Sequence, residues 1–299
     1  MVKLAVVTGA NQGIGYYIVK ALLLQGGFKV QMMCRRTDAA NEAISKLKAE
    51  VPTADAGLLL KPIELRLDDD ASISSAVSHM SEKLGEGETI DVLINNAGVL
   101  FSEESAPEMS LYERAEKTVK VNTIGTLQLT EGLLPLMSRG GRIIMVSSRM
   151  GAFNAAATSE ALRTKLASLD GSPDEAIRLT ADYLQKSAAN TAQEAGWVVD
   201  GKSAYCVSKA LLNMWVRLVT VASGGSGSGS SAYKEKRIKI ISCSPGWCQT
   251  RMTGQKGHKT AEEGADTPAW LTWEADNLIK AGGFYADRKL IRYADGEDE

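Results

Sequence analysis

Short apolar, β-branched runs recur along the chain, and the stretches between them carry apolar residues at a helical period. The runs occupy residues 4–7, 29–34, 61–67, 91–95, 142–147, 237–243 and 283–286. Strands that alternate with amphipathic helices are typical of right-handed βαβ crossovers, in which a parallel sheet is covered by helices on both faces. The pattern therefore predicts a doubly wound α/β fold.

Two segments depart from this alternation. Residues 223–231 read SGGSGSGSS, a composition that predicts a flexible connection before the sixth strand. Residues 149–204 are polar and rich in alanine, with helical patches at 155–169 and 173–195, and they precede a helix that begins near Ser203. Because the insertion contains no predicted strand, we expect one domain over residues 1–299 with helices added to it.

A glycine-rich turn follows the first predicted strand. Residues 8–15 read TGANQGIG, and helical periodicity begins directly after them. Glycines allow a tight turn and let the backbone approach a pyrophosphate, which the N–H groups at the start of a helix can bind. The spacing differs from the commoner G-x-G-x-x-G fingerprint, and a turn without a ligand is the alternative. We expect these residues to contact a dinucleotide: Gly9, Asn11, Gln12, Gly13, Ile14 and Gly15.

The second predicted strand ends in two arginines, Arg35 and Arg36. An acidic residue at this place would accept hydrogen bonds from a ribose 2′-hydroxyl and repel a 2′-phosphate. Guanidinium groups bind phosphate with two parallel hydrogen bonds. The pair therefore favours NADP(H) over NAD(H), while two solvated loop arginines remain the alternative.

Tyr205 and Lys209 are four residues apart, a spacing that puts both side chains on one face of a helix. A tyrosine has an ordinary pKa of about 10, so proton transfer near neutral pH needs a nearby cation. The pairs Tyr16/Lys20 and Tyr285/Lys289 share this spacing. Only Tyr205/Lys209 follows a polar strand end, the MVSS of residues 145–148, and the central strand ends in NNAG at the same carboxyl edge.

Six motifs occur together in a characteristic order: TGANQGIG (8–15), NNAG (95–98), VN (121–122), VSS (146–148), YCVSK (205–209) and PGWCQT (245–250). In this the chain resembles the short-chain dehydrogenase/reductases over essentially its whole length. It is similar in particular to their carbonyl reductase branch, through PGWCQTRM, EEGADTP (262–268), GGFYADRK and the 57 residues that separate Ser148 from Tyr205.

The resemblance implies a Rossmann fold and a role for each of four catalytic residues. The fold is a seven-stranded parallel sheet in the order 3-2-1-4-5-6-7. Ser148, rather than Ser147, would bind the substrate carbonyl, and Tyr205 would protonate the developing alkoxide. Lys209 would lower the pKa of Tyr205 and hold the nicotinamide ribose. Asn122 would anchor a water that links Lys209 to solvent.

The resemblance also assigns the remaining contacts. Asn95, Ala97 and Gly98 would line the adenosine side of the cofactor, and Pro245, Gly246 and Thr250 would lie at the nicotinamide carboxamide. Either Asp68 or Arg66 would contact the adenine. Three apolar residues are candidates for the substrate pocket, with core packing as the alternative: Met150, Trp247 and Met252.

Composition limits the partners and the location of the protein. The 34 basic and 36 acidic residues are well mixed, so neither nucleic acid nor an anionic membrane is an expected partner. The 4 cysteines lack metal-ligand spacing and fit a reducing compartment. No apolar run approaches the length of a membrane span, and the N-terminal apolar stretch is short for a signal peptide. We therefore expect a cytoplasmic protein without a metal.

Together these features predict NADPH-dependent reduction of ketones, aldehydes or quinones by a monomer, since the insertion precedes the helix whose equivalent forms the dimer interface in shorter relatives. Two alternatives remain. One is a ketone reductase dedicated to a single pathway, and the other is a noncatalytic NADP(H)-binding sensor or scaffold. The second fits less well, because such proteins tend to lose the tyrosine or the lysine.

Overall fold

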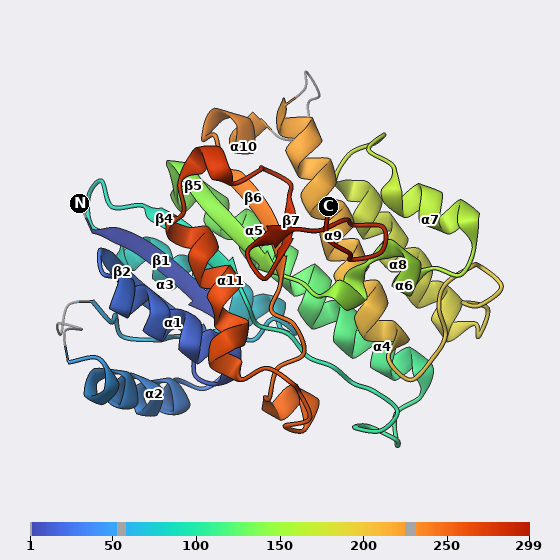
Figure 1. Cartoon of the computed structure of the whole chain (residues 1–299), viewed down its shortest axis with the longest axis horizontal. Helices are drawn as coiled ribbons and strands as arrows, with labels where there is room; N and C mark the ends of the chain where they lie inside the picture. Colours follow the sequence, from blue (N-terminus) through green and yellow to red (C-terminus); the bar gives the residue numbers. More distant parts are fainter. Residues whose placement is uncertain (1, 53–57, 225–230) are drawn as a thin grey trace.

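The fold is built on one sheet, described by a computed structural model that covers residues 2–52, 58–224 and 231–299 (Figure 1). The described residues form eight strands in the order β3-β2-β1-β4-β5-β6-β7-β8. The strands are β1 (Lys3–Thr8), β2 (Phe28–Cys34), β3 (Ile63–Glu64), β4 (Ile90–Asn95), β5 (Met137–Val146), β6 (Lys239–Ser244), β7 (Phe284–Ala286) and β8 (Lys289–Leu290). The predicted order of seven parallel strands is confirmed, and β8 adds a short antiparallel edge.

Helices cover both faces of this sheet (Figure 1). They are α1 (Gly13–Gln25), α2 (Thr37–Glu50), α3 (Asp70–Lys83), α4 (Leu111–Val119), α5 (Thr126–Leu133), α6 (Phe153–Ala156), α7 (Glu160–Ala167), α8 (Asp174–Ala188), α9 (Ser203–Gly224), α10 (Ser231–Glu235) and α11 (Ala261–Trp273). One buried apolar cluster joins the sheet to α1, α2 and α11, and a second joins it to α3, α4, α5 and α9. The central strands are therefore buried on both faces, which explains their continuous apolar runs.

The third strand is shorter than the predicted run of residues 61–67. Only Ile63 and Glu64 pair with β2 as a strand. Pro62 has no N–H group to donate to a neighbouring strand. The apolar residues that follow, Leu65 and Leu67, are still buried in the core, and the Leu65 N–H makes one more hydrogen bond to β2, to the Cys34 carbonyl at 2.9 Å.

The insertion of residues 149–204 is helical, as predicted, and contains the short turn Arg149–Gly151 followed by α6, α7 and α8. All three helices pack against α9, and α8 packs against α4 as well, on the outside of the molecule (Figure 1). The next helix, α9, begins at Ser203. Of the predicted Gly/Ser connection, the first two residues end α9 and Ser231 begins α10, and the rest lies outside the described residues.

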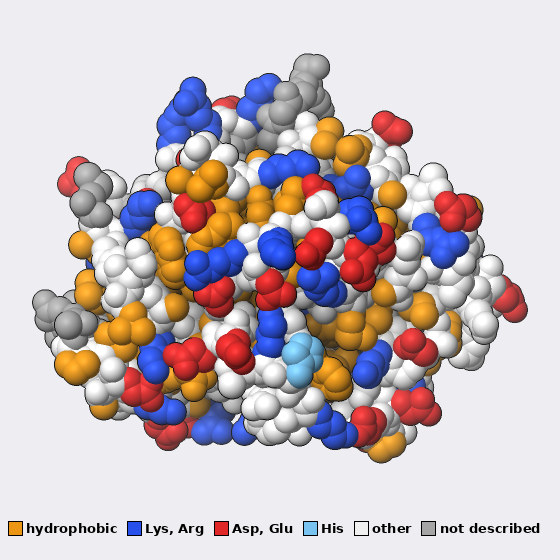
Figure 2. Space-filling model, in the orientation of Figure 1, with side chains coloured by type: hydrophobic (Ala, Val, Ile, Leu, Met, Phe, Trp, Pro, Cys, Tyr) orange, Lys and Arg blue, Asp and Glu red, His pale blue; other side chains and the backbone are white. Residues whose placement is uncertain are grey.

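The surface carries mixed charge. Basic and acidic side chains alternate over the face seen in Figure 2. Among the described residues, no helix combines the length and the apolar character that a membrane crossing requires.

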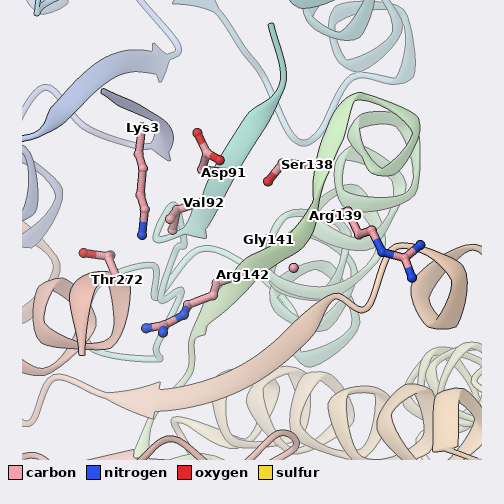
Figure 3. Close-up of a pocket in the computed structure, with 9 residues that line it drawn as sticks. Lys3, Asp91, Val92, Ser138, Arg139, Gly141, Arg142 and Thr272 are labelled. Carbon is pink, nitrogen blue, oxygen red and sulfur yellow. The ribbon is translucent and has the colours of Figure 1, made fainter. Parts of the chain in front are cut away.

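A small cavity of ≈ 170 Å³ lies where β1, β4 and β5 begin, lined by residues that include Lys3, Asp91, Arg142 and Thr272. Figure 3 shows Arg142 reaching from β5 toward Thr272 on α11. Its guanidinium donates to the carbonyl oxygens of Leu271 (2.7 Å) and Glu274 (2.6 Å) at the end of α11. Because the last carbonyls of a helix have no partner within the helix, Arg142 fastens α11 to the sheet.

Replacing Arg142 by alanine is expected to lower the free energy of unfolding by about 3 kcal/mol, because half-buried helix-end carbonyls lose their donors. Urea denaturation measures the change. The matched control is Arg178→Ala, which removes an exposed i,i+3 ion pair with Glu175 and should cost below about 1 kcal/mol. Equal losses in the two variants would show that Arg142 does not fasten α11.

Candidate active site

The glycine-rich turn lies at the carboxyl edge of the sheet and has the shape of an anion cradle. A Cβ atom on Gly15 would lie 2.3 Å from the carbonyl oxygen of Gly9, and Gly9 itself has a φ of +63°. No side chain caps the N-terminus of α1, and its first turn has no acidic residue. Its N–H groups and dipole thus face the turn, as pyrophosphate binding requires.

Thr8 and Asn96 fasten this turn to the end of β4. The Thr8 hydroxyl accepts hydrogen bonds from the N–H groups of Asn96 and Ala97, both at 3.0 Å, and the Asn96 amide donates to the carbonyl of Thr8 at 2.9 Å. Asn95 points the other way, and its buried amide donates to Thr130 at 2.9 Å. Only the backbone of Asn95 therefore remains at the edge, and Asn96, which the sequence analysis did not select, shapes the turn.

The two arginines after β2 differ in their surroundings. Arg36 donates to both carboxylate oxygens of Asp38, at 3.1 and 2.5 Å, and its guanidinium holds the pKa of Asp38 at about 2. Arg35 is exposed and forms no ion pair within the described part of the chain. Arg35 is therefore the guanidinium that is available to a phosphate. The sequence analysis missed Asp38, although it lies only two residues beyond Arg36.

The two candidates for the adenine contact lie side by side. Arg66 and Asp68 are both about half exposed, and their charged groups are 3.7 Å apart. Asp68 precedes Asp69, whose carboxylate caps α3. The structure places both candidates at the same point beside the sheet, so each can still serve the predicted role.

Tyr205, Ser148 and Lys209 come together where β5 ends against the first turns of α9. The Ser148 hydroxyl acts on that of Tyr205 and lowers its pKa. Lys209 is 4% exposed, donates to the Val146 carbonyl at 2.8 Å, and has its ammonium 5.8 Å from the centre of the Tyr205 ring. The Ser147 hydroxyl donates to the carbonyl of Lys209 at 3.4 Å and so faces the helix.

Asn122 completes the cluster from a turn of π-helix, Lys120–Gly125, a conformation that often marks functional sites. Its amide nitrogen donates to the Val99 carbonyl (2.9 Å) and to Ser208 (3.1 Å), and its oxygen accepts from the Val99 N–H at 2.8 Å. A Cβ on Gly98 would lie 3.2 Å from the Asn122 oxygen and 3.5 Å from the Lys209 ammonium. Gly98 thus leaves room for these groups, and Asn122 orders the backbone around them.

The electrostatics differ from the expectation for Tyr205. Burial raises the pKa of Tyr205 to about 12, against the opposing effect of the Ser148 hydrogen bond. Burial also lowers the pKa of Lys209 to about 8. The Lys209 ammonium bonds to Val146 and lies beside the Tyr205 ring. At neutral pH the site therefore combines a protonated phenol with a buried cation.

The residues after β6 approach the glycine-rich turn. Gly246, which follows Pro245, has a φ of +85°, and Thr250 lies so close that a Cβ on Gly13 would be 3.5 Å from its methyl group. Thr250 also begins the short turn Arg251–Thr253. The segment that was predicted to contact the nicotinamide carboxamide therefore adjoins the turn that was predicted to bind the pyrophosphate.

The three apolar substrate candidates are near the surface. Trp247 is 51% exposed and Met252 40%, which excludes core packing for these two, and Met150 is half-buried. A cavity of ≈ 370 Å³ lies close by, yet none of the three lines it. Its lining is polar: Ser102, Glu103, Glu104, Gly201 and Lys202.

Two contacts link this polar cavity to the predicted substrate segment. The Lys202 ammonium lies 6.0 Å from the Trp247 ring, and Lys256 pairs with Glu104 at 2.6 Å. The sequence analysis missed the cavity because its walls come from loops about a hundred residues apart, neither of which carries a motif.

The other two Tyr/Lys pairs do not adjoin a serine at the end of a strand. Lys20 pairs with Glu50 at 3.0 Å beside the buried ring of Tyr16. The Tyr285 hydroxyl accepts from the Lys280 N–H at 2.8 Å, and the Lys289 side chain is 70% exposed. Only the third pair, Tyr205/Lys209, adjoins a strand-end serine.

Fold and site together define a doubly wound α/β protein with a Ser-Tyr-Lys cluster and a glycine-rich turn at the carboxyl edge of its sheet. The family model described as short chain dehydrogenase matches residues 3–161. The chain belongs to the short-chain dehydrogenase family of oxidoreductases.

The similar proteins include several carbonyl reductases. Carbonyl reductase (NADPH) 1 of Homo sapiens is 32% identical over 290 residues, 97% of this chain and 98% of that protein. The Bos taurus protein of the same name is 30% identical over 294 residues, again 97% and 98%. Among solved structures, salutaridine reductase from Papaver somniferum has a TM-score of 0.78 and 29% identity, covering 95% of this chain and 99% of that one.

Proposed function

We propose that the protein is an NADPH-dependent carbonyl reductase that converts ketones, aldehydes or quinones to alcohols. The observation that carries the proposal is the packing of the turn after Ser148 against α9, which brings Ser148 close to Tyr205 and to the buried ammonium of Lys209. The similarity to carbonyl reductases along nearly the whole chain supports the same reaction class.

The chain's own residues handle the oxygen of the substrate. NADPH, when bound, supplies the hydride that adds to the carbonyl carbon. Ser148 donates a hydrogen bond to the carbonyl oxygen, and Tyr205 gives that oxygen its proton, so one hydride and one proton convert C=O to CH–OH. Since Tyr205 is protonated at neutral pH, the proton that this step requires is in place.

Lys209 and Asn122 support the proton transfer. The Lys209 ammonium stabilises the phenolate that Tyr205 becomes, and in this proposal it also binds the nicotinamide ribose. Asn122 fixes the backbone around Lys209 through Val99 and through Ser208 of α9. A water held near Asn122 would return the proton from solvent.

The cofactor-binding groups also fit NADPH. The uncapped start of α1 suits a pyrophosphate, and Arg35 is the available partner for a 2′-phosphate. We further propose a cytoplasmic, single-domain monomer. The packing of α8 against α9 supports the monomer, because it covers the helix whose equivalent is expected to form the dimer interface in shorter relatives.

Tyr205→Phe is expected to lower kcat by at least about 1000-fold, because the variant keeps the ring and loses the proton donor. A panel of quinones, aldehydes and ketones with NADPH, and NADH for comparison, measures turnover. NADPH fluorescence measures the dissociation constant, which should change less than about twofold because the hydroxyl alone is removed. Undiminished turnover in the variant would refute the mechanism, and an inactive wild-type protein would favour the noncatalytic sensor.

The pH dependence should follow Lys209. Its folded-state pKa is lowered to about 8, so the ammonium is present below that pH and is lost as the pH rises through it. Tyr205 keeps its proton over the same range. We therefore expect kcat/KM for NADPH, which reports the free enzyme, to fall about tenfold per unit well above pH 8. A flat profile to pH 10 in protein shown to be folded by circular dichroism would contradict this role of Lys209.

Arg35→Ala is expected to raise the KM for NADPH by about 10- to 100-fold, the loss of one charge-assisted contact with the 2′-phosphate. Arg36→Ala is the matched control and should have a much smaller effect, because Asp38 already neutralises that guanidinium. The KM for NADH should stay unchanged in both variants. A larger effect at position 36 would reverse the assignment.

A further inference from the structure

The turn that follows Ser148 is bound by the C-terminal end of the chain. The Arg149 guanidinium donates to the Gly296 carbonyl and lies 3.4 Å from the carboxylate of Asp298. Figure 1 shows the C-terminal segment crossing in front of α9 to reach this place. Residues 291–298, which we name the C-terminal loop, are thus in direct contact with the segment that carries the proposed substrate-binding serine.

Backbone contacts extend this junction beyond Arg149. The N–H of Phe153 donates to the Tyr293 carbonyl at 2.9 Å, and that of Asn154 donates to Ala294 at 3.0 Å. The rings of Phe153 and Tyr293 are stacked with centroids 6.0 Å apart, and the Arg217 guanidinium lies within 5.5 Å of both. The C-terminal loop therefore contacts residues 149–154 through both backbone hydrogen bonds and side chains.

The C-terminal loop is held in place by contacts within itself and with the edge of the sheet. Arg292 pairs with Asp295 at 3.0 Å and donates to the Asp298 carbonyl at 2.9 Å. The Tyr293 hydroxyl donates to the Gly282 carbonyl at 3.0 Å, and its ring stacks on Phe284 of β7. Because these contacts tie the loop to the sheet edge, it offers Arg149 a fixed partner.

On its inner side, the turn is fixed to the catalytic elements. The N–H of Arg149 donates to the Ser244 hydroxyl at 3.0 Å, and Asn213 of α9 donates to the Gly151 carbonyl at 3.0 Å. A Cβ on Gly151 would lie 2.7 Å from the Cβ of Lys209. Any movement of the turn is therefore transmitted directly to the neighbourhood of Ser148 and Lys209.

We propose that Arg149 is a positioning residue for the reduction: by binding the C-terminal loop through Gly296 and Asp298, it holds the Ser148 hydroxyl against Tyr205. The inference rests on the proposed function. Ser148 accepts a hydrogen bond from the Met150 N–H at 3.1 Å and lowers the pKa of Tyr205, so the orientation of its hydroxyl toward Tyr205 depends on the shape of this turn. Arg149 acts through Ser148 and needs no contact with substrate or cofactor.

Arg149→Ala is expected to lower kcat by about 10- to 50-fold, with a dissociation constant for NADPH within about twofold of wild type, because the cofactor contacts lie elsewhere. Arg149→Lys keeps one donor and should recover part of the loss. The matched control is Arg288→Ala, which removes a two-point pair with Asp266 at similar exposure and should leave kcat unchanged. Thermal unfolding of all three variants separates lost stability from lost positioning.

A double-mutant cycle with Ser148→Ala provides the decisive comparison. If Arg149 acts through Ser148, the Arg149→Ala substitution should change kcat by less than about twofold in the Ser148→Ala background. In the oxidative direction, where Tyr205 acts as the base, Arg149→Ala should shift the ascending limb of the pH profile to higher pH, because a hydrogen bond donated by Ser148 stabilises the phenolate.

The outcomes separate this inference from the function on which it rests. Wild-type turnover combined with an unaffected kcat in Arg149→Ala would overturn the positioning role alone. Equal effects of Arg149→Ala with and without the Ser148 hydroxyl would overturn it as well, and so would a lower melting temperature with unchanged kcat and pH profile. A wild-type protein that reduces no carbonyl compound would overturn the proposed function, and the positioning role with it.

Discussion

The burial of the Lys209 ammonium is the constraint that determines how closely the other elements of the site must pack. The charge is almost wholly removed from water, has one hydrogen bond, to Val146 at the end of β5, and has no ion pair among the described residues. Such a group costs free energy unless its surroundings hold it in place. The first turns of α9 must therefore press against the end of β5, which Gly98 and Gly151 permit by having no side chains at the points of closest approach.

The same close approach organises the cofactor side of the edge. Segments of the chain approach one another closely at this edge. Glycines lie at the points of closest approach, where a Cβ would crowd a neighbouring backbone or side chain: Gly9, Gly15, Gly98 and Gly151. Polar side chains then join the segments, as Thr8 and Asn96 join β1 to β4, and Asn122 joins Val99 to α9. The edge is thus held mainly by hydrogen bonds between short side chains and backbone.

The sequence predicted those features that depend on local pattern. Apolar runs located the strands, and the spacing of Tyr205 and Lys209 placed both on the helix that begins at Ser203. Features that depend on side-chain direction or on distant contacts were missed. Asn95 was selected over Asn96, although neighbouring residues of a strand point to opposite faces and only one of them faces the turn. The contact of Arg149 with Gly296 joins positions 147 residues apart, and the two residues of β8 are too few to show any periodicity.

Burial also couples the acid-base properties of the site to its stability. The apolar surroundings that lower the pKa of Lys209 to about 8 also raise that of Tyr205 to about 12. Both shifts have one cause, because desolvation penalises whichever form is charged. A phenol in such a place keeps its proton at neutral pH and is a weak acid, so proton transfer from Tyr205 depends on groups that stabilise the phenolate as it forms. Ser148 is such a group, so the rigidity of the turn that follows it affects the reaction. Contacts of Arg149 with Ser244 and with the C-terminal loop supply that rigidity.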